Sequence, residues 1–152
     1  NEAFRRSLAP KGLKGNELPC ISTVVDAYNL ASMKTIIPIS GFDRDCLKFP
    51  FQLRFAKNNE AFTGIGMSKP LALTDKMLVL ADEKQVLCIY PYRDSNHTKI
   101  VMQTRNVLVV GYGALGITEK QLADAVEETL SYVKLVSGGE KERVKVFNSK
   151  RK

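Results

Sequence analysis

Residues 92–98 hold the side chains of this sequence that are best suited to chemistry. The run reads Tyr92-Arg93-Asp94-Ser95-Asn96-His97-Thr98. It places a carboxylate, a guanidinium, hydroxyls, an amide and an imidazole between two apolar segments. Such groups can orient a water molecule, an amino group and an ester oxygen without a metal ion. The same composition also fits an exposed turn whose Asp94 and Asn96 bond to nearby backbone groups.

A second motif, at residues 111–116, imitates a dinucleotide-binding fingerprint. It reads Gly-Tyr-Gly-Ala-Leu-Gly and stands between a predicted strand and a predicted helix. A phosphate-binding helix begins inside such a motif, whereas a capping box of Thr118 and Gln121 starts this helix after the last glycine. The acidic residue expected about 20 positions later, at the end of a strand, is replaced by Ser131 within the helix. We therefore interpret the motif as a flexible strand-to-helix loop.

Other catalytic and metal-binding patterns are missing from the sequence. It contains neither a G-x-x-x-x-G-K-S/T phosphate loop nor a G-x-S-x-G nucleophile elbow. His97 is the sole histidine, and Cys20, Cys46 and Cys88 form no C-x-x-C pair. The sequence therefore predicts no metal site, no nucleophilic triad and no cofactor. We interpret the cysteines as buried and reduced, as is usual for a cytoplasmic protein.

The strands that must position the polar run are short. Apolar or alternating segments predict strands at residues 51–55, 77–81, 86–90, 99–103, 107–110 and 143–147. The second and third of these are typical of a hairpin, because turn-forming residues 82–85 join them. The polar run would then connect the end of this hairpin to the next strand.

Three helices are predicted, near the two ends of the chain. The first covers residues 2–8 and is followed by a Gly/Lys-rich connector at residues 11–17. The second follows Pro19, with an apolar face of Ile21, Val24, Val25 and Tyr28, and a polar stripe that includes Asn29. The third begins at Thr118 and ends at Gly138 and Gly139. Helices at the ends and strands between them favour an α+β fold over a doubly wound α/β fold.

Length and charge indicate one domain with basic ends. The 152 residues fit a single domain spanning 1–152. Residues 1–17 carry +2 and residues 140–152 carry +4 of the net charge of +7, which leaves +1 for the residues between them. The basic stretch at 140–152 can contact phosphates through Lys150, Arg151 and Lys152, or it can be a solvated, mobile tail. The sequence has no signal peptide or apolar run of membrane-spanning length. Because it does not begin with Met, we expect an N-terminal portion to precede it.

Several segments, in this order, resemble the editing module of the β subunit of phenylalanyl-tRNA synthetase, and more closely the freestanding proteins made of that module alone. They are Leu18-Pro19, Val24-Val25-Asp26-Ala27-Tyr28-Asn29-Leu30, Ile37-Pro38-Ile39-Ser40-Gly41-Phe42-Asp43, Leu53-Arg54-Phe55-Ala56, Tyr92-Arg93-Asp94-Ser95, Thr98 and Thr104-Arg105-Asn106. The resemblance runs from about residue 18 to residue 110 and keeps the order and spacing of the segments.

This resemblance implies a mixed, partly barrel-like β-sheet flanked by helices, with a pocket that receives the 3′ end of an aminoacyl-tRNA. In the synthetase the pocket hydrolyses tyrosine wrongly attached to the phenylalanine tRNA. Asp94 takes the position of a glutamate that helps to read the amino acid, and Asn29 borders the pocket. Ser40 replaces a histidine of the family's Pro-Leu-His-Ala-Phe-Asp run, and Tyr-Arg-Asp replaces Gly-Gly-Glu. The substrate is therefore expected to differ from the family's tyrosyl ester.

Three hypotheses follow for function. The first is a trans-editing hydrolase, with Asp94 on the α-ammonium or on a side-chain hydroxyl of the substrate and Arg93 on a phosphate or ribose. Asn29, Ser40 and Thr98 would line the pocket and position the water. The second is a non-catalytic RNA-binding module, and the third is a pocket for a free amino acid. All three expect a cytoplasmic protein without membrane segments, and the first two expect tRNA or RNA, not DNA, as the partner.

Overall fold

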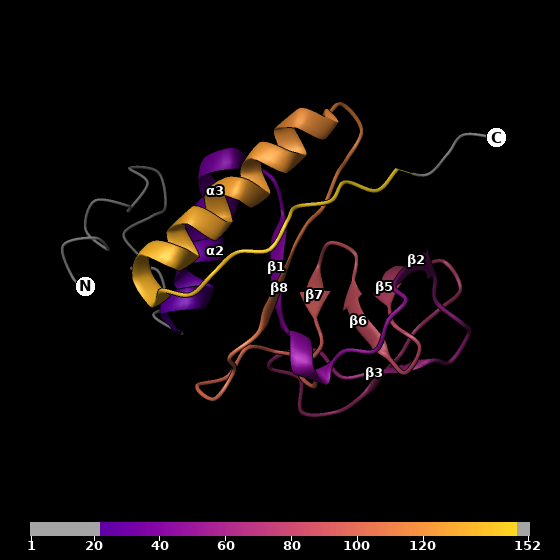
Figure 1. Ribbon diagram of the computed structural model, residues 1–152. Coiled ribbons are helices and arrows are strands. Elements are labelled where there is room, and N and C mark those ends of the chain that lie inside the picture. Colours follow the sequence, from indigo (N-terminus) through magenta and orange to yellow (C-terminus); the bar gives the residue numbers. More distant parts are fainter. Residues whose placement is uncertain (1–21, 149–152) are drawn as a thin grey trace, which may run out of the picture.

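The computed structural model describes residues 22–148 and shows the expected α+β fold (Figure 1). In chain order its elements are α2 (Thr23–Thr35), β1 (Ile39–Asp43), the 3-10 turn η1 (Arg44–Cys46), β2 (Gln52–Phe55), β3 (Ala61–Phe62), β4 (Leu71–Ala72), β5 (Leu78–Ala81), β6 (Val86–Ile89), β7 (Arg93–Asp94), β8 (Val107–Gly111) and α3 (Glu119–Ser137). All pairs between these strands are antiparallel. Neither helix is long and apolar enough to cross a membrane.

The described strands form three separate sheets, and they do not close into a barrel. β1 pairs with β8, β2-β5-β6-β7 form the largest sheet, and β3 pairs with β4. In Figure 1 the β1–β8 pair lies between the two helices and the four-stranded sheet. This layered arrangement puts α2, β1 and β7 within reach of one another.

β1 is buried along its whole length and its partner β8 is half-buried, because the side chains of this pair alternate between two cores. Ile39 and Val109 face the helices and pack with residues of α2 and α3. Phe42 and Leu108 face the opposite way and pack against Leu87 of the four-stranded sheet. A third core lies on the far side of that sheet, under β3 and β4.

Helix α3 begins and ends where the sequence predicts. The Thr118 backbone N–H donates to Gln121 Oε1 at 2.9 Å, and the Gln121 N–H donates to Thr118 Oγ1 at 3.2 Å, which confirms the capping box. A cap of this kind typically contributes about 1 kcal/mol. Gly138 and Gly139 take positive φ angles of 72° and 88° directly after the helix, so they end it.

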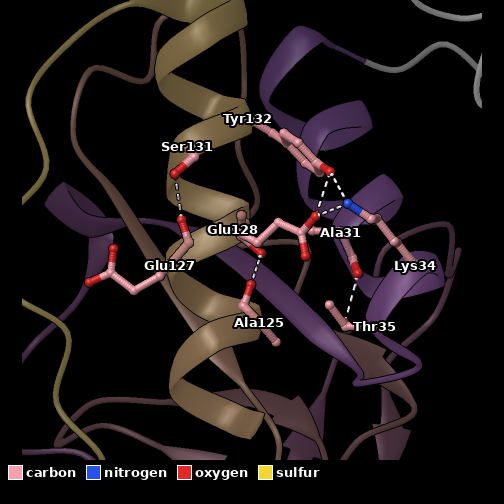
Figure 2. Close-up of polar contacts among 9 residues, drawn as sticks. Ala31, Lys34, Thr35, Ala125, Glu127, Glu128, Ser131 and Tyr132 are labelled. Atoms are coloured by element: carbon pink, nitrogen blue, oxygen red, sulfur yellow. Dashed lines mark hydrogen bonds and ion pairs between the residues drawn. The ribbon is translucent and has the colours of Figure 1, made fainter. Parts of the chain in front are cut away.

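Polar side chains also link the two helices to each other (Figure 2). Lys34 of α2 donates a hydrogen bond to Glu128 of α3 and another to the Tyr132 hydroxyl, the latter at 2.9 Å. The Tyr132 hydroxyl in turn donates to Glu128 Oε1 at 2.5 Å. Because the Lys34 side chain is exposed, its ion pair with Glu128 contributes little to stability.

The glycine-rich motif has a packing role. A Cβ atom at Gly111 would lie 2.8 Å from Val126 Cγ2 and 3.1 Å from Leu122 Cδ1, so the glycine allows α3 to approach β8. Gly116 has a φ of 92°, which turns the chain before Thr118. The helix begins after the motif, which agrees with the rejection of a nucleotide site.

Two predicted strands are wrong. Residues 99–103 form no strand: Lys99 makes only an isolated antiparallel bridge to Phe42, and a turn follows at residues 102–103. The Thr104 hydroxyl holds this turn, because it accepts a hydrogen bond from the Val101 N–H at 3.0 Å and donates to Asp43 Oδ2 at 2.6 Å. Residues 143–147 show the expected alternation of half-buried and exposed side chains but pair with no strand. They run back along α3, where Lys141 contacts Glu127 and Asn148 contacts Glu119.

The helix predictions also need adjustment. α2 begins at Thr23, with Ser22 as its N-cap, and it buries Val25 and Tyr28 as expected while Val24 is only half-buried. The helix predicted at residues 2–8 lies outside the described residues. Four strands lie outside the predicted ranges: β1, with five residues, and β3, β4 and β7, with two residues each.

Candidate functional site

A pocket of about 280 Å³ opens where α2, β1 and the segment leading into β7 meet. Its lining residues are Val25, Tyr28, Asn29, Ile39, Ser40, Pro91, Tyr92, Arg93 and Asp94. Four of the five residues predicted to catalyse or to bind substrate, namely Asn29, Ser40, Arg93 and Asp94, come together here. They reach the pocket from three separate segments, which only the tertiary fold brings together.

The Asp94 carboxylate is held from across the pocket by Ser40. Ser40 Oγ donates a hydrogen bond to Asp94 Oδ1 at 2.7 Å. Burial raises the pKa of the Asp94 carboxyl above its usual value, and the hydrogen bond from Ser40 acts in the opposite direction. The hydrogen bonds found for this carboxylate leave Oδ2 without a donor from the described residues. An arriving cation or hydrogen-bond donor would therefore find an acceptor with a fixed orientation.

Behind Asp94 lies a buried thiol. Cys88 is the strand partner of Asp94, and its Sγ lies 3.2 Å from the hydroxyl oxygen of Tyr112. Burial, and to a smaller extent the charge of Asp94, raises the pKa of Cys88 to about 11. The thiol therefore stays protonated at neutral pH and is not a nucleophile for the pocket.

The Arg93 guanidinium is engaged at the edge of the pocket. Its Nη1 donates to the backbone oxygen of Ile65 at 2.8 Å, and its Nη2 donates to the Tyr92 hydroxyl at 3.3 Å. The stem lies so close to Gly64 that a Cβ there would meet Arg93 Cδ at 2.5 Å. Arg93 thus links the polar run to residues 64–65, and these two nitrogens are not directed at a phosphate.

Residues 92–98 are not a solvated turn. Ser95 and Thr98 are buried, and Arg93 and Asp94 pair with β6. The structure does not bring Thr98 to the pocket, because it is not among the lining residues. Its hydroxyl is fully buried, and within residues 22–148 it has no hydrogen-bond partner. His97 is exposed and does not line the pocket either.

Sequence reasoning placed Tyr28 in the core only, yet it also lines the pocket. Val25, Tyr28 and Asn29 stand at positions i, i+3 and i+4 of α2, so they share one face of the helix. Since Asn29 was expected at the pocket, this spacing could have brought Tyr28 there as well. The physical signal was present, but it was assigned to the core.

A smaller hollow of about 210 Å³ lies between α2 and α3. Its two carboxylates are already paired, Asp124 with Lys120 and Glu128 with Lys34. Among the described residues, no group of three or more His, Cys, Asp or Glu side chains could hold a metal ion. The predicted RNA contacts Lys150, Arg151 and Lys152 lie outside the described residues. The pocket beside Asp94 is therefore the strongest candidate site.

The pocket lies inside a stretch that matches a known family. The model of the B3/4 domain matches residues 5–132. The chain belongs to the B3/4 domain family. The matched stretch includes every residue that lines the pocket and most of α3.

Curated relatives of this B3/4 domain are beta subunits of phenylalanine–tRNA ligase. The chain is 30% identical over 97 residues to the subunit of Francisella tularensis subsp. tularensis. The aligned residues make up 64% of this chain and 12% of that protein. It is 28% identical over 89 residues to the subunit of Haemophilus ducreyi, and these residues make up 59% of this chain and 11% of that protein. The chain therefore spans about a tenth of the length of these relatives.

The fold is similar to that of a solved structure. The crystal structure of an N-terminal fragment of the phenylalanyl-tRNA synthetase beta subunit from Pyrococcus horikoshii superposes with a TM-score of 0.61 and 17% identity. The similarity covers 74% of this chain and 40% of that fragment. At this identity it supports the B3/4 fold and carries no residue roles.

Proposed function

We propose that this B3/4 domain binds tRNA and hydrolyses the ester of a mischarged aminoacyl-tRNA in the pocket beside Asp94. The similarity to phenylalanine–tRNA ligase beta subunits supports the choice of tRNA as partner. The observation that carries the proposal is the Asp94 carboxylate, oriented by Ser40 in a pocket of about 280 Å³. A fixed anion in a small pocket suits the α-ammonium group of an aminoacyl ester.

In the proposed reaction, Asp94 holds the α-ammonium group and the Asn29 amide positions a water molecule. The water oxygen bonds to the carbonyl carbon, and the bond from that carbon to the ribose oxygen breaks. One water proton passes to the departing ribose oxygen, and the amino acid leaves as an acid that loses its second proton to solvent. The reaction consumes one water molecule and requires no cofactor or electron transfer.

The engagement of Arg93 favours an ester over a free amino acid. A free amino acid carries a carboxylate, which would need a cation in the pocket. Arg93 is the cationic residue that lines the pocket, and two of its nitrogens donate to Ile65 and Tyr92. An aminoacyl ester has no free carboxylate, so Asp94 alone satisfies its charge.

The test is deacylation of a panel of tRNAs charged with labelled, mismatched amino acids. Wild-type protein should release at least one amino acid faster than buffer, and Asp94→Ala should slow that release about 10- to 100-fold, the usual effect of losing a bond to a charged group. Asp75→Ala, which changes an exposed aspartate away from the pocket, is the matched control. If wild type releases no amino acid faster than buffer, the hydrolase proposal is wrong.

The same protein preparations separate the two other hypotheses. Binding of tRNA that weakens steeply with salt and survives Asp94→Ala would indicate a non-catalytic RNA-binding module. Thermal stabilisation by free amino acids, without stabilisation by tRNA, would indicate a small-molecule pocket.

A further inference from the structure

The ring of Tyr28 is seated against the backbone of Gly41. A Cβ atom at Gly41 would lie 2.7 Å from Tyr28 Cε1, 2.9 Å from Tyr28 Cδ1 and 2.8 Å from Ile100 Cδ1. Real Cβ atoms do not approach other atoms so closely, so the ring occupies space that exists only because residue 41 is a glycine. The ring is therefore fixed between α2 and β1.

Within the described part of the chain, the hydroxyl of this fixed ring has no hydrogen-bond partner. The Tyr28 side chain is 9% exposed and lines the pocket, yet residues 22–148 supply no donor or acceptor to its oxygen. The hydroxyl oxygen is not one of the fully buried unpaired side-chain atoms of the described residues, so it stays accessible to a partner that enters from outside. The neighbouring Asn29 amide lines the pocket and is likewise unpaired within the described residues.

The charge state of the hydroxyl makes it a donor. Burial raises the pKa of Tyr28 to about 12, and the negative charges of Asp94 and then Asp26 add to the effect. The phenol consequently keeps its proton at every pH at which an aminoacyl ester survives. The pocket thus presents a neutral O–H donor and, at Asp94, an anion.

This pair of groups matches the two polar ends of an α-aminoacyl group. The ammonium nitrogen and the acyl carbonyl of such a group are separated by a single carbon atom, so an anion and a donor lining one small pocket can bind them together. A donor aimed at a carbonyl oxygen also stabilises the negative charge that develops there during attack by water.

We propose that the Tyr28 hydroxyl donates a hydrogen bond to the acyl carbonyl oxygen of the substrate, and that Gly41 is the positioning residue that sets where this hydroxyl lies. The proposal rests on the proposed function, because it assigns Tyr28 a role in the same pocket and the same ester hydrolysis. Tyr28 remains protonated throughout, since it donates a hydrogen bond and transfers no proton.

The experiment compares Tyr28→Phe with Tyr132→Phe. The first substitution removes only the hydroxyl in the pocket and keeps the ring that packs against Gly41. The second removes a tyrosine hydroxyl that bonds to Glu128 on the α2–α3 side, away from this pocket. Thermal unfolding first establishes that both variants are folded. The rate of release and its dependence on aminoacyl-tRNA concentration are then measured separately.

We expect Tyr28→Phe to lower kcat by about 100-fold, as for the loss of one oxyanion donor, and to raise KM by about fivefold, as for the loss of a hydrogen bond to the bound substrate. Tyr132→Phe should stay within about twofold of wild type. Gly41→Ala should lower kcat as well, and the Gly41→Ala/Tyr28→Phe double variant should be no slower than the slower single variant, because both act through one hydroxyl. A Tyr28→Phe variant that keeps kcat within about twofold of an active wild type overturns this inference alone.

Binding of a non-hydrolysable aminoacyl-adenosine amide distinguishes failure of the enzyme proposal from failure of this one. If wild type is inactive but binds the amide, and Tyr28→Phe weakens that binding about fivefold or more, the hydrolase proposal fails and the Tyr28 contact stands. If wild type and Tyr28→Phe bind the amide equally, the contact is wrong. If wild type neither hydrolyses the esters nor binds the amide, both proposals are wrong.

Discussion

Ser40 Oγ donates a hydrogen bond to Asp94 Oδ1 at 2.7 Å, and this bond connects β1 of the two-stranded sheet to β7 of the four-stranded sheet. It therefore joins two layers of the fold at the pocket. The bond directs one oxygen of the carboxylate toward β1 and leaves the other for a ligand. Ser40 stands where the resemblance expects histidine, so in this chain the position orients an anion.

Asp94→Asn should make the protein more stable at neutral pH. The asparagine oxygen can still accept the Ser40 hydrogen bond, while the buried charge disappears. Because the pKa of Asp94 is raised in the folded protein, the folded state binds more protons than the unfolded state between the ordinary and the raised pKa. The free energy of unfolding of wild type thus falls as pH rises through that interval, and the loss is complete above it.

Urea unfolding as a function of pH measures this effect. The stability of Asp94→Asn relative to wild type should be greatest at neutral pH and vanish below the ordinary pKa of aspartate. Asp75→Asn, at an exposed site, should show no such trend. If Asp94→Asn is less stable than wild type at neutral pH, the charge of Asp94 stabilises the fold, which contradicts the conclusion that burial disfavours this charge.

Gly111→Ala should destabilise the protein by about 1–3 kcal/mol through overpacking. The added methyl group would lie 2.8 Å from Val126 Cγ2. This contact is too short, so α3 would have to move away from β8. Gly113→Ala is the matched control, since its Cβ would lie 3.6 Å from Leu122 Cδ2, an ordinary contact. Equal unfolding midpoints for the two variants would contradict the packing role given to Gly111.

Ile36→Gly should stabilise the protein by about 0.5–1 kcal/mol. Ile36 follows α2 with a φ of 58°, a conformation unfavourable for a β-branched residue, and its side chain is 86% exposed. Asn59→Gly is the control, because asparagine adopts its φ of 62° with little strain. Thermal unfolding should show a larger gain at position 36 than at position 59, and a loss at position 36 would disprove the strain argument.

Cys46 and Cys88 should differ in reactivity toward iodoacetamide. The expectation of buried cysteines is correct for Cys88, which has a pKa of about 11, and wrong for Cys46, which is exposed. At pH 8 we expect modification of native Cys88 to be at least about 100-fold slower, as judged by site-resolved mass spectrometry. In denaturant the two rates should converge, and equal rates in the native protein would show that the β6–β7 region opens readily.

The sequence predicted those elements whose signals are local. The capping box of α3 involves residues three positions apart, and the hairpin of β5 and β6 is marked by its own turn residues. β3, β4 and β7 have two residues each, so their pairing depends on contacts with distant segments and leaves no periodic signal. For the same reason residues 99–103 were misassigned, because the Thr104 bond to Asp43 is a tertiary contact.

The site was predictable in part. Chemistry and resemblance indicated Asn29, Ser40, Arg93 and Asp94, and all four line one pocket. The position of Thr98 could not be inferred, since its burial depends on tertiary packing that leaves no local pattern in residues 92–98. The Tyr28 hydroxyl was missed because an aromatic residue on an apolar helix face is usually assigned to the core.

A crystal structure with a non-hydrolysable aminoacyl-adenosine amide tests the central claim most directly. We predict that the aminoacyl group occupies the pocket lined by α2, β1 and β7, with its ammonium nitrogen within hydrogen-bond distance of Asp94 Oδ2 and its carbonyl oxygen within reach of the Tyr28 hydroxyl. An aminoacyl group bound elsewhere on the protein, or one whose ammonium group is directed away from Asp94, would contradict the account.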